Sequence, residues 1–334
     1  MTEQRTIQPT PVGALRFNTD SSKLEYFNGN QYVNITTDSP EQNTGGTRGL
    51  IMGGITSGRT NLVTFITINT TGDAADFGDL VQTASQGAGL GSRTRAVAGG
   101  GTPSSPGGTN NIDFKTISST GNFADFGDFV TTRFSRVAVA NATRGVFFGG
   151  AVAPNAYNEI EFITIAATGN SIDFGDCSVG RQEAGAAGNP TRGIVTGGSY
   201  PDASIDYVTL STTGNAADFG DCTANIWNTR GGNCGNAVRG LMAGGGSGSS
   251  NAIQFLTIST LGNTVDFGDR LVAKSQISHM SSTTRAVFAG AGEGDTDVID
   301  YVEIMSTGNA VDFGNLTENY GYAAGASNGH GGLG

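Results

Sequence analysis

The stretch IEFITIAATGNSIDFGD, residues 160–176, decides how this chain folds. It begins with IEFITI, in which apolar and polar residues alternate with the period of two that is typical of a pleated strand. Thr-Gly-Asn at 168–170 then predicts a turn, and a second strand leads into Asp-Phe-Gly. The same unit recurs with the Phe of Asp-Phe-Gly at 77, 126, 174, 219, 267 and 313. The chain is therefore a sixfold repeat.

Each repeat contains four short strand candidates. One strand follows an Arg and ends in a Gly pair, the next two surround the Thr-Gly-Asn turn, and the fourth is small and apolar, as in RVAVAN at 136–141. The loop after the Gly pair varies from 6 to 10 residues, whereas the distance from IEFITI to Asp-Phe-Gly is constant. A four-stranded unit of about 47 residues predicts the blades of a β-propeller, with the variable loops on one face.

The two ends of the repeat region predict how the propeller closes. No small apolar strand precedes Arg48, whereas an extra one, GYAAGASN at 321–328, follows the sixth Asp-Phe-Gly. We expect this C-terminal strand to pair with the strand that begins near Arg48 and so complete the first blade. Such pairing would remove an exposed sheet edge. The predicted fold class is an all-β, six-bladed propeller over residues 46–334.

Residues 1–45 form a separate N-terminal module and linker. Three short strands are predicted at 14–19, 23–28 and 31–35, and Asn28-Gly29 between the last two is a strong hairpin signal. So small a unit rarely stabilises itself, so we expect it to pack on a partner or to trimerise. Its candidate partner-binding residues are Phe17, Tyr26, Phe27 and Tyr32.

The composition excludes several classes of function. The net charge is −11 and only 14% of residues are charged, which disfavours binding to nucleic acid and to anionic membrane surfaces. No apolar stretch approaches the roughly 20 residues that would span a bilayer. The three cysteines, Cys177, Cys222 and Cys234, have no framework spacing, so we expect free, partly buried thiols and no disulfide.

Two charged residues recur in every repeat. We interpret both sets as structural: the first Asp caps a turn, and the Asp after Asp-Phe-Gly pairs with a repeat Arg. The alternatives are a ligand-binding ring of Arg and a Ca²⁺ site at Asp pairs such as Asp76 and Asp79. The repeated residues are Arg48, Arg95, Arg144, Arg192, Arg239 and Arg285, with Asp76, Asp125, Asp173, Asp218, Asp266 and Asp312.

No catalytic constellation stands out in the sequence. Asp-Phe-Gly also occurs in protein kinases, but six copies without the kinase Gly-rich loop, its Lys or a catalytic loop argue against that interpretation. The two histidines, His279 and His330, form no recognisable triad or metal pattern. We expect no catalytic, cofactor or metal site.

The remaining candidate contact sites are the polar loops at 55–62, 102–111, 152–159, 199–204, 246–251 and 292–297. Tyr157 and Tyr200 are their candidate partner-binding aromatic residues. This chemistry suits contact with protein or glycan, and it equally suits plain solvated loops.

Two features, the repeat and the N-terminal module, carry a resemblance to a known family. IDYVTLSTTGNAADFGD (205–221) and IDYVEIMSTGNAVDFGN (299–315) resemble the kelch-like repeats in tail-fibre and virion structural proteins of tailed phages, notably phages of marine cyanobacteria. The segment GALRFNTDSSKLEYFNGNQYVNI (13–35) resembles a small module of phage tail and fibre proteins. The chain departs from eukaryotic kelch repeats, which carry a regular Trp, because Trp227 is its only one.

The resemblance implies a non-enzymatic virion structural protein of the tail-fibre or adhesin type, made in the host cytoplasm. The N-terminal module would attach to other virion proteins, and the propeller loops would face outward toward host-surface glycan or protein. A homo-oligomer is expected, with a trimer as the candidate state. One alternative is a capsid decoration or head-fibre protein. Another is a polysaccharide-degrading propeller enzyme, which would need paired carboxylates or a Tyr/His site at a channel mouth.

Overall fold

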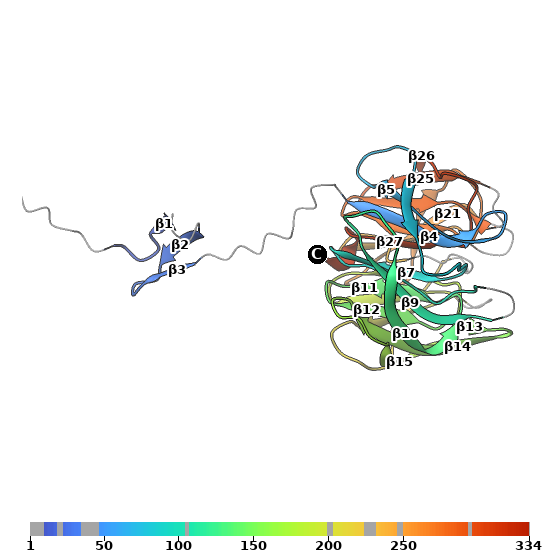
Figure 1. Cartoon of the computed structure of the whole chain (residues 1–334), viewed down its shortest axis with the longest axis horizontal. Helices are drawn as coiled ribbons and strands as arrows, with labels where there is room; N and C mark the ends of the chain where they lie inside the picture. The colour runs from blue at the N-terminus through green and yellow to red at the C-terminus, as the bar shows by residue number, and fades with distance from the viewer. Residues whose placement is uncertain are drawn as a thin grey trace, which may run out of the picture. The chain divides into compact units, whose positions relative to one another are not determined.

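The computed structural model describes residues 10–18, 23–34, 47–103, 107–198, 203–223, 232–245, 250–292 and 296–333. The chain divides into two compact units, residues 1–42 and 43–334 (Figure 1). The described residues form antiparallel sheets and no α-helix, with one 3₁₀ turn at Gly331–Leu333. The expectation of an all-β protein is thus confirmed. In these ranges no helix is long and apolar enough to cross a membrane.

The first unit contains one sheet of three antiparallel strands, as the sequence predicted. Its strands are β1 (Leu15–Asn18), β2 (Lys23–Phe27) and β3 (Tyr32–Asn34), in that order. The turn between β2 and β3 is held by the Asn28 side chain, whose Oδ1 accepts hydrogen bonds from the backbone N–H groups of Asn30 and Gln31. Asn favours such turns because its side chain bonds to nearby backbone.

The second unit contains six antiparallel sheets, numbered here in chain order (Figure 1). Sheet 1 has β4 (Arg48–Ile55), β5 (Arg59–Thr67), β6 (Ala75–Asp79) and β27 (Ala324–Ser327). Sheet 2 has β7 (Ala88–Gly91), β8 (Arg95–Gly99), β9 (Thr109–Thr116) and β10 (Ala124–Arg133). Sheet 3 has β11 (Val137–Ala140), β12 (Arg144–Phe148), β13 (Ala151–Val152), β14 (Asn155–Thr164) and β15 (Ile172–Arg181). Sheet 4 has β16 (Gly185–Gly188), β17 (Arg192–Thr196), β18 (Ser204–Thr209) and β19 (Ala217–Asp221). Sheet 5 has β20 (Arg239–Ala243), β21 (Ala252–Thr257) and β22 (Val265–Asp269). Sheet 6 has β23 (Ser278–Ser281), β24 (Arg285–Ala289), β25 (Val298–Glu303) and β26 (Val311–Asn315).

The C-terminal strand completes the first sheet. β27 pairs antiparallel with β4, with Ala324 opposite Met52 and Ser327 opposite Gly49. The expected pairing of 321–328 with the strand at Arg48 is confirmed.

The fifth sheet departs from the expectation of four strands per repeat. In place of the small apolar strand, sheet 5 has two isolated bridges, Asn233 with Ala186 of sheet 4 and Gly235 with Gly240. Gly235 has a φ of +134°, outside the range of a regular strand, so the ladder cannot continue through it.

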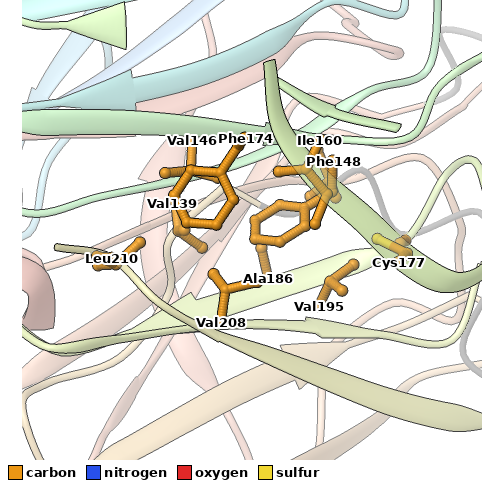
Figure 2. Packing of buried hydrophobic residues seen from close by; sticks show 12 residues of the cluster. Val139, Val146, Phe148, Ile160, Phe174, Cys177, Ala186, Val195, Val208 and Leu210 are labelled. Carbon is orange, nitrogen blue, oxygen red and sulfur yellow. The ribbon is translucent and has the colours of Figure 1, made fainter. Parts of the chain in front are cut away.

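The core lies between neighbouring sheets. Figure 2 shows one cluster, in which Phe148, Ile160 and Phe174 of sheet 3 pack against Val195 and Val208 of sheet 4. Both faces of these strands are largely covered: Ile160 and Ile163 of β14 are buried, and so are Ile205 and Val208 of β18. The Phe of each Asp-Phe-Gly is buried at such a junction.

The Thr-Gly-Asn turn of each repeat, which precedes the strand that carries Asp-Phe-Gly, docks on the preceding sheet. The N–H of Gly214 in sheet 4 donates to the Phe174 carbonyl at 2.7 Å, and Asn215 Oδ1 accepts from the N–H of Asp176 at 3.1 Å. Gly175 has a φ of +143°, and a Cβ there would lie 2.4 Å from the Gly214 carbonyl oxygen. The Gly of Asp-Phe-Gly is therefore required by this close approach as well as by its φ.

The same docking occurs at all six junctions, including the one between the last sheet and the first. Gly72 of sheet 1 donates to the Phe313 carbonyl of sheet 6 at 2.8 Å, and Asp73 Oδ1 accepts from the N–H of Asn315 at 2.9 Å. Asp73 stands where the other repeats have Asn, and it performs the same role because only the acceptor oxygen is used.

Candidate functional site

The repeated arginines bind backbone and aromatic rings, which corrects the ion-pair interpretation. Nη1 of Arg144 donates to the carbonyl of Leu210 in the next sheet at 3.1 Å, and its guanidinium lies 4.8 Å from the centre of the Phe162 ring. All six arginines, Arg48, Arg95, Arg144, Arg192, Arg239 and Arg285, make this pair of contacts. Of the six, Arg285 alone also forms an ion pair within the described ranges, with Glu303 at 2.9 Å.

The repeated aspartates do not cap turns as expected. Each lies on the last strand of its repeat with an exposed side chain: Asp76, Asp125, Asp173, Asp218, Asp266 and Asp312. The residue two positions after the Phe donates its backbone N–H to the Asn side chain of the docked turn described above, and it is not the partner of a repeat Arg. The repeated arginines thus have structural contacts, but other ones than those predicted.

Buried ion pairs do occur, but with arginines outside the repeat pattern. Arg136 pairs with Glu161 at 3.0 Å, Arg181 with Asp206 at 3.0 Å and Arg270 with Asp300 at 3.0 Å. Burial opposes ionisation of Glu161, but Arg136 and hydroxyl donors hold its pKa below its usual value. Burial raises the pKa of Asp300 despite Arg270. The sequence analysis missed these pairs because their arginines come from three different positions of the repeat.

The C-terminal residues cover one end of the second unit. His330 Nε2 donates to the Gly91 carbonyl at 2.7 Å, and its Nδ1 accepts from Asn233 Nδ2 at 2.9 Å. The N–H of Gly331 donates to Gly235, and Arg93 donates to the Leu333 carbonyl at 2.7 Å. Gly91 and Arg93 lie at the turn between β7 and β8 of sheet 2, and Asn233 and Gly235 lie just before β20 of sheet 5. Because neighbouring strands are antiparallel, the variable loops that follow the Gly pairs leave their sheets at the opposite end, the loop-bearing end.

Around the loop-bearing end, five equivalent residues adopt a left-handed backbone. Each stands two residues before the small apolar strand of its sheet. The five have φ of 56° to 64°: Gln86, Ser135, Glu183, Gln276 and Tyr322. Backbone hydrogen bonds link four of these residues in series. The N–H of Gln86 donates to the Tyr322 carbonyl, that of Ser135 to the Gln86 carbonyl, and that of Glu183 to the Ser135 carbonyl. Such a conformation is uncommon outside Gly and is often found at functional sites.

The one predicted loop aromatic that the structure describes belongs to a polar cluster. Tyr157 lies in β14, half-buried, and the Arg133 guanidinium stacks on its ring at 4.1 Å. Arg133 pairs with Glu159 at 2.7 Å, and this hydrogen bond lowers the pKa of Glu159. Arg133 Nη1 and Glu159 Oε2 are buried and have no partner within the described ranges. Tyr200 lies outside the described residues.

The predicted aromatics of the N-terminal sheet lie on two different faces. Phe17 and Tyr26 share one face with Leu15 and Leu24, because Leu15 lies opposite Tyr26 and Phe17 opposite Leu24. All four are exposed, Phe17 by 62%. The opposite face is packed: Phe27 contacts Tyr32 with ring centres 5.3 Å apart, and Arg16 covers Tyr32 at 3.7 Å.

Arg16 also pairs with the buried Glu25 at 2.8 Å. The four candidate aromatic residues are therefore divided between the two faces of the sheet. The exposed apolar face consists of Leu15, Phe17, Leu24 and Tyr26.

The three cysteines are free and buried, deeper than expected. In the part of the chain that the structure describes, no group of three or more His, Cys, Asp or Glu side chains is placed to hold a metal ion. Comparison with protein-family models and with curated proteins found no match to this chain.

Proposed function

We propose that this chain is a non-enzymatic structural protein of a phage virion, of the tail-fibre or adhesin type, built as a six-bladed propeller behind a small attachment module. The propeller is supported by the sixfold docking of Asp-Phe-Gly and Thr-Gly-Asn, which returns from sheet 6 to sheet 1. The pairing of β27 with β4 supports it as well, since it joins the two ends of the repeat region.

The observation that carries the functional proposal is the exposed apolar face of the N-terminal sheet. A three-stranded sheet of this size buries too little apolar surface to be stable alone. Leu15 and Phe17 expose 64% and 62% of their surface on one side of it. Apolar side chains grouped in this way mark a protein contact. The occupant we propose is another structural protein of the particle, and trimerisation of the module is the alternative outcome.

The loop-bearing end of the propeller is the proposed outward face. It carries the variable loops, the left-handed polar residues and the cluster of Tyr157, Arg133 and Glu159. Amide, hydroxyl and aromatic groups suit contact with host-surface glycan or protein.

The attachment test uses full-length variants. Leu15→Ser together with Phe17→Ser should prevent incorporation into particles while leaving the melting temperature of the propeller unchanged. Val130→Ser, at a residue that is 68% exposed on β10, is the matched control and should incorporate normally. Normal incorporation of the double variant would reject the module as the anchor. Loss of self-association with normal incorporation would assign the face to trimerisation.

Imaging locates the protein on the particle. Burial raises the pKa of the Cys177 thiol to about 12, and the other two thiols are also buried, so the native cysteines should not be labelled. A Val130→Cys variant then carries a single accessible label. Signal on the tail supports the tail-fibre proposal, and signal on the capsid supports a decoration or head-fibre role instead.

A further inference from the structure

The second residue of the segment equivalent to IEFITI is polar in every repeat, and four of these residues are acidic. They are Asp113, Glu161, Asp206 and Asp300, all nearly or fully buried. Each accepts a hydrogen bond from the backbone N–H of the chain leaving the preceding sheet, as Asp113 does from Val81 at 3.1 Å. They are therefore equivalent buried carboxylates in different sheets.

Three of the four carboxylates pair with a buried guanidinium, whereas within the described ranges Asp113 has no such partner. The three arginines reach the carboxylate from three repeat positions, those of Arg270, Arg181 and Arg136. In the junction that holds Asp113, these positions are Leu80, Ala84 and Gly87. Asp113 accepts hydrogen bonds from two neutral groups, the Val81 N–H and Asn111 Nδ2.

A cavity occupies the space that the guanidinium fills elsewhere. It is lined by Leu80, Ala84 and Gly87 together with Gly100, Asn111 and Asp113, and its volume is about 20 Å³. That volume admits a group the size of one water molecule. No other lining residue is charged.

The cavity also presents a second acceptor that the arginines use. Arg136 Nη1 donates to the carbonyl of Gly149 at 3.3 Å, and Arg181 Nη1 donates to Gly197 at 2.5 Å. Gly100 is the equivalent first glycine of the pair in sheet 2. A Cβ built on Gly87 would lie 3.5 Å from the Gly100 carbonyl oxygen, so a side chain at 87 would point toward this acceptor without a clash.

We infer that the Asp113 cavity binds a primary ammonium group, which donates to the Asp113 carboxylate and to the Gly100 carbonyl in place of the missing guanidinium. An ammonium group matches the cavity in size, carries the N–H donors that both acceptors require, and neutralises a buried charge that is otherwise unpaired. The group is either a free ammonium ion or the end of a longer amine, such as a lysine side chain of a partner.

Burial raises the pKa of Asp113 to about 6, with the exposed Asp125 opposite it on β10 adding to the effect. The bound cation should therefore be lost as the pH falls through about 6, because the protonated carboxyl no longer attracts it.

The test is the melting temperature of the full chain at pH 7.5 and constant ionic strength in different chloride salts. Ammonium should raise it by about 2 °C or more over tetramethylammonium, which is too large for the cavity. Butylammonium separates the two sources: a matching rise indicates that an amine at the end of a chain can enter, and no rise restricts the site to the free ion. Equal melting temperatures in ammonium, sodium and tetramethylammonium would overturn the inference.

Two variants and a control make the result specific. Asp113→Asn removes the charge and should abolish the ammonium response, whereas Asp125→Asn, at an exposed carboxylate, should retain it. Gly87→Arg supplies a guanidinium from the position of Arg136, so it should raise the melting temperature in tetramethylammonium and remove the response. If Asp113→Asn does not fold, the ammonium response of the Gly87→Arg variant tests the inference instead. A response that persists in Gly87→Arg would contradict the proposed position of the cation.

Discussion

Nη1 of Arg285 in the sixth sheet donates a hydrogen bond to the backbone carbonyl of Ile68 in the first sheet, at 3.4 Å. The equivalent bond joins Arg48 of the first sheet to Ile117 of the second, and so on through the repeats. The two ends of the repeat region, residues 46–334, are thereby held by the same contact as its interior. Each bond ties a half-buried guanidinium to a neighbouring sheet, so its loss should affect stability at the junction.

Arg144→Ala should destabilise the fold by about 1–2 kcal/mol. The variant loses one hydrogen bond to the Leu210 carbonyl and the stacking on Phe162, and it leaves no buried carboxylate unpaired. Urea denaturation measures the loss. Arg144→Lys should recover only part of it, since an ammonium cannot stack as a guanidinium does. A loss above about 4 kcal/mol would instead indicate the buried ion pair that the repeat pattern first suggested.

Removal of the C-terminal strand should open the first sheet. A chain ending at residue 320 leaves β4 without the partner that covers its edge, so it should melt at a lower temperature and aggregate. A chain ending at residue 328 keeps the strand and loses only the segment that carries His330. It should stay soluble, with a smaller decrease. Equal melting temperatures for the longer truncation and the full chain would show that β27 does not stabilise the fold.

Replacing both Arg270 and Asp300, which form a buried ion pair, should lower the free energy of unfolding less than replacing Asp300 alone. Asp300→Thr alone should cost about 3–5 kcal/mol, because it leaves the buried Arg270 charge unpaired. Adding Arg270→Leu reproduces the residues of the junction between sheets 6 and 1, where Leu316 and Thr64 occupy these positions. The double variant should recover at least half of the loss in urea denaturation. Additive losses would show that the two residues do not interact.

Stability should fall as the pH decreases from about 6.5 toward about 4, in part through His330. Burial lowers its pKa from 6.5 to about 4, so the folded chain keeps it neutral while the unfolded chain binds a proton. His279, also buried, should act in the same direction, since its pKa falls to about 3. His330→Gln removes one titrating group, and the decrease between pH 7 and pH 4.5 should be smaller than in the native chain. An unchanged pH profile would mean that His330 is accessible to water.

Much of the fold could be predicted from particular residues. Ile160, Phe162 and Thr164 occupy every second position of β14, which is the period that predicted this strand. The extra apolar segment after Phe313 predicted the pairing of β27 with β4. The partners of Arg144 could not be predicted, because a backbone carbonyl has no signature in the sequence. The two faces of the N-terminal sheet follow from its register, which separated Phe17 and Tyr26 from Phe27 and Tyr32.

By itself, the sequence determined the sixfold repeat, the strands and the residues that face the core, since these depend on local periodicity and on Gly at fixed positions. Only the tertiary structure decided where the buried charges meet, that His330 is enclosed beside Gly91 and Asn233, and that Asp113 adjoins a cavity. The physical reason is that these sites are assembled from neighbouring sheets. Asp113 adjoins Leu80, Ala84 and Gly87, whereas equivalent junctions place an arginine at one of these three positions. The sequence does not show which residues are equivalent in this way until the sheets are placed side by side.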